Sequence, residues 1–359
     1  MNKEITVRKS NFELLRIISM LMIIAYHLFI HGVVRNDYVT IESDFWIKDN
    51  VFNKIFSLFF FPGGEIGVGL FFMITGFFLY GKSKGHVSKV VIKSAFYAIL
   101  SILLILLVWC IGSGNLNPPE ALDNLVRFLL LPSFEGNWWF VTAYILLIFL
   151  VPTLNEFLKK KPMLVFIFVF YIYSVSLLIS ATNFDVIKAV LFYVMGYLFR
   201  MNNTIKKYLK KKQIILIVAC MLGWTAIVLL KYLVLINYFN LKIINKLISV
   251  FISAVLVPIC VWLFFGVFSS FEYRKLPFIN KIAASTFGVY LIHDSRAVRY
   301  LLWNKILRIA DSQLSLCYFP ILIILEVSLI FGVCSFIDFL YQKTIERAVY
   351  NKFSGYLDF

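Results

Sequence analysis

The chain has 359 residues, of which 61% are hydrophobic and only 15% are charged. A soluble domain is nearer half apolar and a quarter charged, so this composition indicates a polytopic membrane protein. In a soluble protein the net charge of +16 would suggest a nucleic-acid partner. Here we attribute it to basic residues retained on the cytoplasmic side of a membrane, and we expect no nucleic-acid partner.

Long apolar segments predict an all-α fold, a polytopic membrane helical bundle of about ten transmembrane helices. We expect residues 1–359 to form a single integral membrane domain with no separate soluble domain. Most of the 35 lysines and arginines fall on the side of the N-terminus, so both termini are predicted to be cytoplasmic. The predicted spans are 12–33, 63–81, 94–112, 138–157, 163–180, 185–200, 214–233, 247–268, 283–303 and 318–341.

The first predicted span carries two ionisable residues on one face. Arg16 and His27 are eleven positions apart, which places His27 within about 20° of the direction of Arg16 and about 16 Å further along the helix. Such groups are costly inside a bilayer, so they are functional candidates. An imidazole exchanges a proton near neutral pH, and a guanidinium binds phosphate in a bidentate way.

These residues also have structural interpretations. Arg16 could extend to the lipid headgroups, and His27 could be a histidine hydrogen-bonded inside the bundle. Glu13, one turn before Arg16, could orient the guanidinium or neutralise it. His31 follows His27 at the spacing of a metal-binding pair, but the sequence has no HExxH pattern and no evident third ligand, so we expect no metal site.

Polar and aromatic residues near the outer ends of later spans could bind a substrate. Glu65 precedes the second span near the predicted level of the first-span histidine. It could bind sugar hydroxyls, steady an imidazolium or be an ordinary interfacial acid. At the start of the fourth span, Trp138 and Trp139 fit an interfacial aromatic belt or a wall for a sugar or acyl chain. Asn137 and Tyr144 add hydrogen-bonding groups there.

The ninth predicted span contains a second intramembrane histidine. Tyr290 and His293 lie about one turn apart in this segment. Two such histidines favour a shared polar cavity over two separately satisfied side chains, so we expect this span to face the first one.

Four sequence blocks occur in a characteristic order along the chain. They are the Arg16–His27 spacing with Glu13 before it, the run GVGLFFMITGFF from Gly67 to Phe78, the aromatic block from Asn137 to Phe140, and the block from Tyr290 to His293. Together they resemble the membrane acyltransferase-3 family, whose members modify bacterial surface polysaccharides and related acceptors. Where many members carry an Arg-x-x-Arg pair after the second block, this chain has Lys82 and Lys84, so the basic site is matched only in part.

The resemblance implies an O-acyltransferase, expected to transfer acetyl, that uses acyl-CoA such as acetyl-CoA from the cytoplasm. The acceptor would be a hydroxyl of an envelope or capsular polysaccharide, or of its lipid-linked precursor, at the bacterial cytoplasmic membrane and among its lipids. Acyl-CoA would be a substrate, and we expect no permanently bound cofactor. Donor and acceptor would enter from opposite faces of the membrane and meet at His27.

The same resemblance and the residue types together assign roles. His27, Arg16 and Glu13 would form the catalytic group, with His27 as general base or as acyl acceptor. Arg16, Lys82 and Lys84 would hold the CoA phosphates. The expected substrate-binding residues are Glu65, Asn137, Trp138, Trp139, Tyr144, Tyr290 and His293.

An alternative class is a transporter or flippase for a glycan or a lipid. Such a protein would also need polar residues inside a helical bundle. The sequence shows neither inverted repeats nor a clearly broken pair of helices, which argues against this class.

Overall fold

The computed structural model describes residues 9–34, 51–82, 87–110, 138–179, 185–202, 211–236, 241–271, 275–295, 298–299, 301–309, 316–346 and 349. Within these ranges all regular structure is helical, which confirms the predicted all-α class. The elements, with η marking a π-helical stretch, are α1 (Ser10–His27), η1 (Leu28–Val34), α3 (Val51–Leu58), α4 (Pro62–Phe78), α5 (Ser88–Cys110), α7 (Trp139–Lys160), α8 (Pro162–Ile179), α9 (Asp185–Met201), α11 (Gln213–Leu235), α12 (Lys242–Phe251), η2 (Ile252–Leu256), α13 (Val257–Ser270), α14 (Pro277–Ala283), α15 (Thr286–His293), η3 (Leu301–Leu307) and α17 (Phe319–Thr344).

Proline marks the start of several of these helices. Pro62, Pro258, Pro277 and Pro320 lie in the first turns of α4, α13, α14 and α17. Proline is favoured at this position because the first N–H groups of a helix have no partner inside it. These prolines therefore favour the start of a new α-helix at their positions, after a turn or after a π-helical stretch.

Seven helical stretches within the described residues are long and apolar enough to cross a membrane. They are Ser10–Val34, Val51–Phe78, Trp139–Lys160, Pro162–Ile179, Gln213–Leu235, Lys242–Ser270 and Phe319–Thr344. This finding supports a multi-pass membrane protein. The count of about ten spans and the cytoplasmic position of both termini stay predictions, since α5 and α9 coincide with two predicted spans but are not among the seven.

The prediction of one continuous helix over residues 283–303 is wrong. α14 ends at Ala283, and α15 begins at Thr286 and has only eight residues. Irregular backbone is tolerated inside a membrane protein where other groups bond to it. Here Thr286 Oγ1 donates to the carbonyl of Ala283 over 2.9 Å, and Gln342 Nε2 of α17 donates to the carbonyl of Ala284 over 3.3 Å. The break is thus stabilised by side chains that no local pattern reveals.

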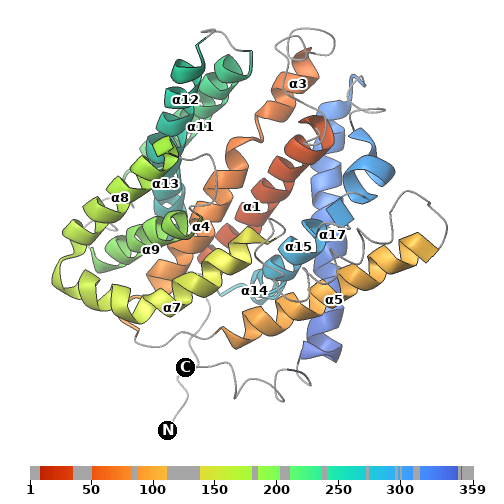
Figure 1. The fold of residues 1–359 in the computed structure, drawn as a ribbon, viewed down its shortest axis with the longest axis horizontal. Coiled ribbons are helices and arrows are strands. Elements are labelled where there is room, and N and C mark those ends of the chain that lie inside the picture. The colour runs from red at the N-terminus through yellow and green to blue at the C-terminus, as the bar shows by residue number, and fades with distance from the viewer. Residues whose placement is uncertain are drawn as a thin grey trace.

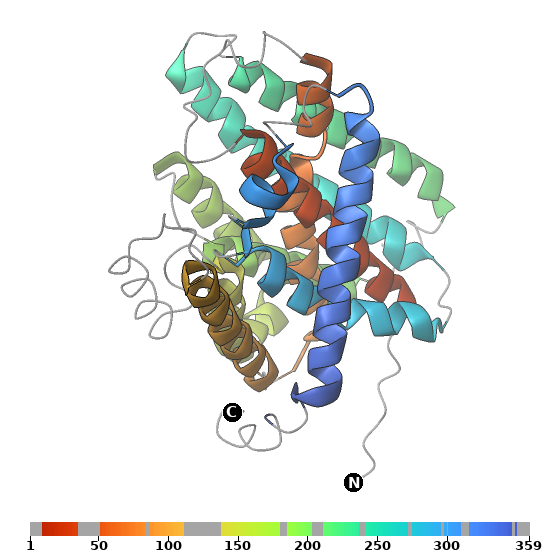
Figure 2. The same ribbon diagram turned by 90° about the vertical axis from the view of Figure 1, so that its right-hand side faces the viewer.

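α1 and α4 lie at the centre of the bundle (Figure 1). The most apolar windows of Ser10–Val34 and Val51–Phe78 are 56% and 61% buried within the protein, against 17% in α8 and 22% in α11 and α17. Figure 2 shows α17 running lengthwise along one side of the molecule, where it contacts α1 and α15. The peripheral helices therefore present apolar side chains outward, as lipid contact requires, while the central ones shape the interior.

Glycines of α4 allow its neighbours to approach closely. A Cβ on Gly67 would lie 2.7 Å from the backbone oxygen of Ser19 in α1. On another face of α4, a Cβ on Gly76 would collide with the backbone carbonyl of Tyr193 in α9. Small residues of this kind permit tight helix packing in membranes. α4 therefore fixes α1 and α9 in register around the interior cavity.

Candidate active site

A cavity of about 490 Å³ is lined by residues of α1, α4, α5, α7, α9, α14 and α15 and of the turn between the last two. Its volume is in the range of small-molecule sites. Of the residues predicted to act in the site, those that line this cavity are Glu13, Arg16, His27, Glu65, Trp139, Tyr144 and Tyr290. The fold therefore brings side chains from four helices, far apart in the sequence, to one space.

Two histidines meet at the wall of the cavity. His27 Nδ1 lies 3.0 Å from His293 Nε2, and His293 Nδ1 lies 2.6 Å from the carbonyl oxygen of Val289. A carbonyl can only accept, so His293 carries its proton on Nδ1, and Nε2 of a neutral His293 is an acceptor. His27 then donates from Nδ1. The remaining ring nitrogen of His27, Nε2, is left with a basic lone pair on a residue that lines the cavity.

An acidic residue and an arginine support this pair. Asp294 Oδ1 lies 3.6 Å from His27 Nδ1 and 2.7 Å from Arg299 Nη2. Asp294 is buried beside His27, where its carboxylate can stabilise positive charge that develops on the imidazole during a reaction. Arg299 in turn compensates the carboxylate and holds it in place.

Sequence reasoning missed both Asp294 and Arg299. A signal was present, because an acid directly after an intramembrane histidine and an arginine five residues later are unusual in an apolar segment. The distance from Asp294 to His27, however, depends on where α15 ends. Asp294 is the C-cap of α15, and its backbone N–H bonds to the carbonyls of Ile292 and Tyr290.

Arg16 faces the same cavity, near the start of α1. Its Nη1 lies 2.7 Å from Glu13 Oε1, and its side chain remains 29% exposed while that of Glu13 is nearly buried. The guanidinium has five N–H donors in a planar fork, so the pairing with Glu13 leaves donors that can reach an anion in the cavity. The ion pair is compatible with either the orienting or the neutralising role expected of Glu13, and both residues line the cavity.

Another part of the cavity carries acids, a lysine and a tryptophan. Glu65 Oε1 accepts a hydrogen bond from Ser253 Oγ over 3.3 Å, and its Oε2 is buried without a partner among the described residues. Asp185 and Lys188, one turn apart at the start of α9, also line the cavity. Lys188 Nζ lies 5.3 Å from the centre of the Trp139 ring, within range of a cation–π contact.

Asp185 and Lys188 were also missed by the sequence reasoning. An acid with a lysine three positions later is common in the first turn of a helix, so nothing in their local pattern distinguishes them from ordinary surface charges.

The other predicted site residues do not line the cavity. His293 is fully buried behind His27, and Trp138 is fully buried as well. Lys82 is exposed after the end of α4 and is not part of the cavity lining. Lys84 and Asn137 lie outside the described residues, so their predicted roles stay predictions.

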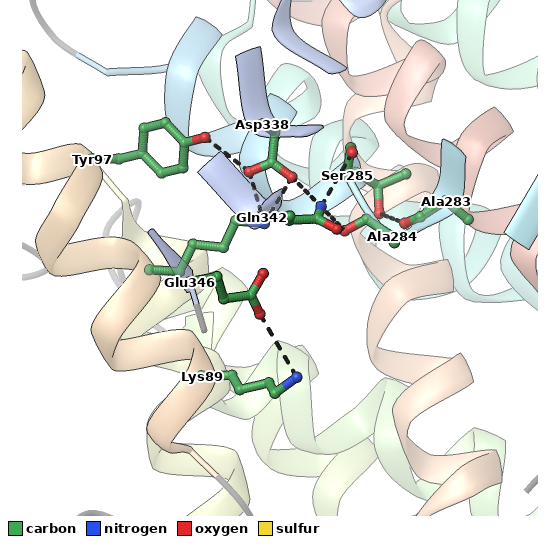
Figure 3. A network of polar contacts seen from close by, with 10 residues as sticks. Lys89, Tyr97, Ala283, Ala284, Ser285, Asp338, Gln342 and Glu346 are labelled. Carbon is green, nitrogen blue, oxygen red and sulfur yellow. Dashed lines mark hydrogen bonds and ion pairs between the residues drawn. The ribbon is translucent and has the colours of Figure 1, made fainter. Parts of the chain in front are cut away.

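A buried polar network fixes the break between α14 and α15, beside the cavity. Figure 3 shows Tyr97 of α5, Gln342 of α17 and Ser285 of the break gathered around Asp338. Tyr97 OH donates to Asp338 Oδ1 over 2.8 Å, and Gln342 Nε2 donates to Asp338 Oδ2 over 2.6 Å and to Ser285 Oγ over 3.3 Å. Lys93 Nζ lies 2.8 Å from both carboxylate oxygens.

Asp338 is wholly buried, and Gly288 of α15 leaves the space that its carboxylate occupies, since a Cβ there would collide with Asp338 Oδ1. The network therefore couples α5 and α17 to α15. α15 carries Tyr290 and His293, so this coupling helps to set where those side chains lie.

These features define a class of protein: a multi-pass helical membrane protein with an internal polar cavity, in which an arginine and a histidine of one central helix face the same space. Residues 9–334 match a family model described as an acyltransferase domain. The chain therefore belongs to the acyltransferase-3 family, as the sequence blocks predicted. No curated protein and no solved structure matches the chain.

Proposed function

We propose that this membrane acyltransferase transfers an acyl group, acetyl in the simplest case, from cytoplasmic acyl-CoA to a hydroxyl of an envelope polysaccharide or of its lipid-linked precursor. The observation that carries the proposal is that Arg16 and His27 line the same cavity from one face of α1. A phosphate-binding group and a basic nitrogen are thereby separated by about 16 Å along the helix. This separation is of the order of the length of an extended pantetheine arm.

In this proposal Arg16 binds a phosphate of the CoA donor, with Glu13 holding the guanidinium in its orientation. The pantetheine arm follows the face of α1 toward His27. Lys82 is exposed and does not line the cavity, whereas Arg16 does, so Arg16 is the proposed principal anion contact and Lys82 keeps its proposed role as a further one. Lys84 keeps its proposed role as a further phosphate contact.

The chemical step needs a base, an acceptor hydroxyl and a thioester. His27 Nε2 takes the hydroxyl proton while the hydroxyl oxygen attacks the thioester carbonyl carbon, forming a C–O bond. The C–S bond then breaks, and the leaving thiolate takes the proton from His27, which returns the imidazole to its neutral form. Asp294 stabilises the transient imidazolium. The Tyr290 hydroxyl belongs to a residue that lines the cavity, and its O–H is the proposed donor to the oxyanion.

The acceptor is proposed to bind against Glu65, Asp185, Lys188 and Trp139. Carboxylates accept hydrogen bonds from sugar hydroxyls, and an indole ring offers an apolar face to a sugar ring. Glu65 Oε2 has no partner among the described residues, so a hydroxyl donor from the acceptor would remove the cost of a buried, unpaired carboxylate oxygen.

A covalent route is the alternative chemistry at the same residue. His27 Nε2 would attack the thioester first and carry the acyl group before passing it to the acceptor. The two routes differ in whether an acylated protein forms when acyl-CoA is present and acceptor is absent. Intact-mass measurement of the protein, quenched after mixing with acetyl-CoA, distinguishes them.

The proposal is tested with purified protein in lipid nanodiscs and radiolabelled acetyl-CoA. We expect wild-type protein to bind acetyl-CoA and to release CoA when acceptor glycan is added, with the label recovered on the glycan. In cells, NMR of the envelope polysaccharide should show O-acyl signals that disappear in the His27→Ala strain. Label that stays on CoA under all these conditions, together with an unchanged polysaccharide, would refute the proposed reaction.

One observation favours the rival transporter class and needs a direct test. The interruption between α14 and α15 beside the cavity is a feature that transporters also use around their binding sites. A transporter would move glycan or lipid across proteoliposomes without consuming acyl-CoA. Glycan translocation that does not depend on acyl-CoA and is insensitive to His27→Ala would support that class instead.

A further inference from the structure

A third ligand joins the pair of histidines on the first helix. His27, His31 and Asp294 each offer one metal-ligating atom, and these three atoms all lie within 4.8 Å of one another. From the sequence alone we expected no metal here, because no third ligand was evident. The structure supplies one from α15, some 260 positions away along the chain.

The local backbone places His27 and His31 on the same side of the first helix. α1 passes into the π-helical stretch η1 directly after His27, so His31 stays on the first helix, and the two ring centres are 5.6 Å apart. Residues four positions apart in a helix face the same way. The His31 ring is thus directed at the same space as the His27 ring, although His31 is not part of the cavity lining.

Asp294 lies beside His27 and is paired with Arg299. Its Oδ1 bonds to Arg299, and a carboxylate has a second oxygen available for another partner. In tetrahedral zinc sites, Zn–N and Zn–O bonds of about 2.0–2.2 Å place neighbouring ligand atoms roughly 3.3–3.6 Å apart. The three ligand atoms lie within 4.8 Å of one another, so metal binding requires the side chains to draw them together by roughly an ångström.

The donor set selects the kind of ion. Two imidazoles and one carboxylate suit Zn²⁺ and related transition-metal ions, whereas Mg²⁺ and Ca²⁺ prefer oxygen ligands alone. The positive charge of Arg299 beside Asp294 opposes binding of a dication, so a readily exchanged ion fits better than a permanent structural one. His27 lines the cavity, which gives an ion a path to the cluster.

We propose that His27, His31 and Asp294 form a binding site for a divalent transition-metal ion, of which Zn²⁺ is the representative, and that occupancy of this site inhibits acyl transfer. The inhibitory part rests on the proposed function of His27 as base. A metal on His27 Nε2 takes the lone pair needed for proton transfer. A metal on His27 Nδ1 displaces the hydrogen bond to His293 that sets the tautomer.

The binding test measures zinc directly and does not depend on enzyme activity. Full-length protein without a polyhistidine tag, in nanodiscs, is dialysed against buffered ZnCl₂, and the bound metal is counted per chain. We expect His31→Gln to bind one zinc fewer than wild type. His86→Gln removes the remaining histidine of the four, which lies outside the described residues, and this control variant should bind as much zinc as wild type.

Cobalt gives a spectroscopic check of the ligands. Co²⁺ in place of Zn²⁺ should produce the intense visible absorption of a four-coordinate site in wild type and in His86→Gln, and this absorption should be absent in His31→Gln. Equal zinc content in wild type and His31→Gln, or an unchanged cobalt spectrum, overturns the site.

The activity test separates the inhibitory role from the site itself. With a chelator present, His31→Gln and wild type should have similar rates of acyl transfer. Added ZnCl₂ should inhibit wild type, and the half-inhibiting concentration should rise at least tenfold in His31→Gln, while MgCl₂ should have no effect on either. Stimulation by zinc, loss of activity on chelation, or equal inhibition of both proteins overturns the inhibitory role. If wild-type protein shows no acyl transfer under any condition, the proposed function is refuted. The number of zinc ions bound per chain still tests whether the metal site exists.

Discussion

His27 of α1 and His293 of α15 are joined ring to ring, with His27 Nδ1 3.0 Å from His293 Nε2. His293 in turn lies 2.6 Å from the carbonyl of Val289, within its own helix. This chain of contacts determines which nitrogen of His27 is left to act on a substrate. It makes the tautomer of His27 a property of the packing between two helices rather than of either helix alone.

The first prediction concerns His27 itself. His27→Ala should lower the rate of acyl transfer by about a hundredfold or more, because general-base catalysis contributes roughly 10²–10⁴. Acyl-CoA binding should be nearly unchanged, since Arg16 remains. Transfer and binding are both measured with labelled acetyl-CoA, in buffer that contains a chelator so that no metal ion occupies His27. His31→Ala is the control and should be much milder; if the two phenotypes are reversed, the wrong histidine has been assigned as the base.

The second prediction separates the carboxylate beside His27 from the one at the acceptor end. Asp294→Asn keeps the shape but loses the charge that stabilises the imidazolium, so kcat should fall about tenfold or more with little change in KM for acyl-CoA. Asp185→Asn is the matched control and should mainly raise KM for the glycan, because Asp185 lines the cavity and Asp294 does not. An Asp294→Asn effect confined to KM would contradict the assigned role.

The third prediction tests the phosphate contact. Arg16→Ala should weaken acyl-CoA binding roughly tenfold to a hundredfold, the size expected for lost charge-assisted hydrogen bonds. Arg16→Lys should lose less, because charge is retained and only the planar fork is removed. Isothermal titration with CoA and with its dephosphorylated analogue measures both effects. Unchanged affinity in both variants, or equal affinity for the two ligands in wild type, would assign Arg16 to the headgroup region instead.

The fourth prediction concerns the buried network around Asp338. Asp338→Ala removes one partner of a buried ion pair and should destabilise the protein by about 3–5 kcal/mol, because Lys93 is left buried and uncompensated. The double change Asp338→Leu with Lys93→Met should cost less than Asp338→Ala alone. Unfolding in a mild detergent, followed by loss of helical circular dichroism, measures the difference. A double variant that is no more stable than the single one would show that the pair is not coupled.

The fifth prediction concerns orientation in the membrane. Lys161, between α7 and α8, and Leu241, at the start of α12, are both exposed. Cysteines placed at these positions, in a variant lacking the five native cysteines, should be labelled by a membrane-impermeant maleimide from the inside only at Lys161 and from the outside only at Leu241. Labelling of both from the same face would show that the predicted alternation of spans is incorrect between them.

Several features followed from the sequence because their physical causes are local. Composition alone indicates a membrane protein, because a chain this apolar has too few polar side chains to form a surface that faces water. The alignment of Arg16 with His27 follows from helical periodicity, and both residues do line the same cavity. Small residues within one helix permit close helix contact, and Gly67 and Gly76 of α4 are found at such contacts.

Other features depend on how separate helices pack, which periodicity does not encode. The segment 283–303 was predicted to be one continuous span, but the bonds that allow it to break come from Gln342 of α17 and from the network around Asp338. Lys82 was predicted from its charge and its place in the sequence to contact a phosphate, but whether it lines the cavity depends on the path of the chain after α4, and it is not among the lining residues.

The sequence by itself therefore determined the membrane class, the family and the polar face of α1, because each depends on residue types and on spacing within one segment. Only the tertiary structure decided which groups surround that face. Asp294, Arg299, Asp185 and Lys188 reach the site through helix ends and crossings, where a shift of one residue in a helix boundary rotates a side chain by about 100°. For the same reason, the third member of the His27–His31 cluster is visible only once α15 is seen to end beside α1.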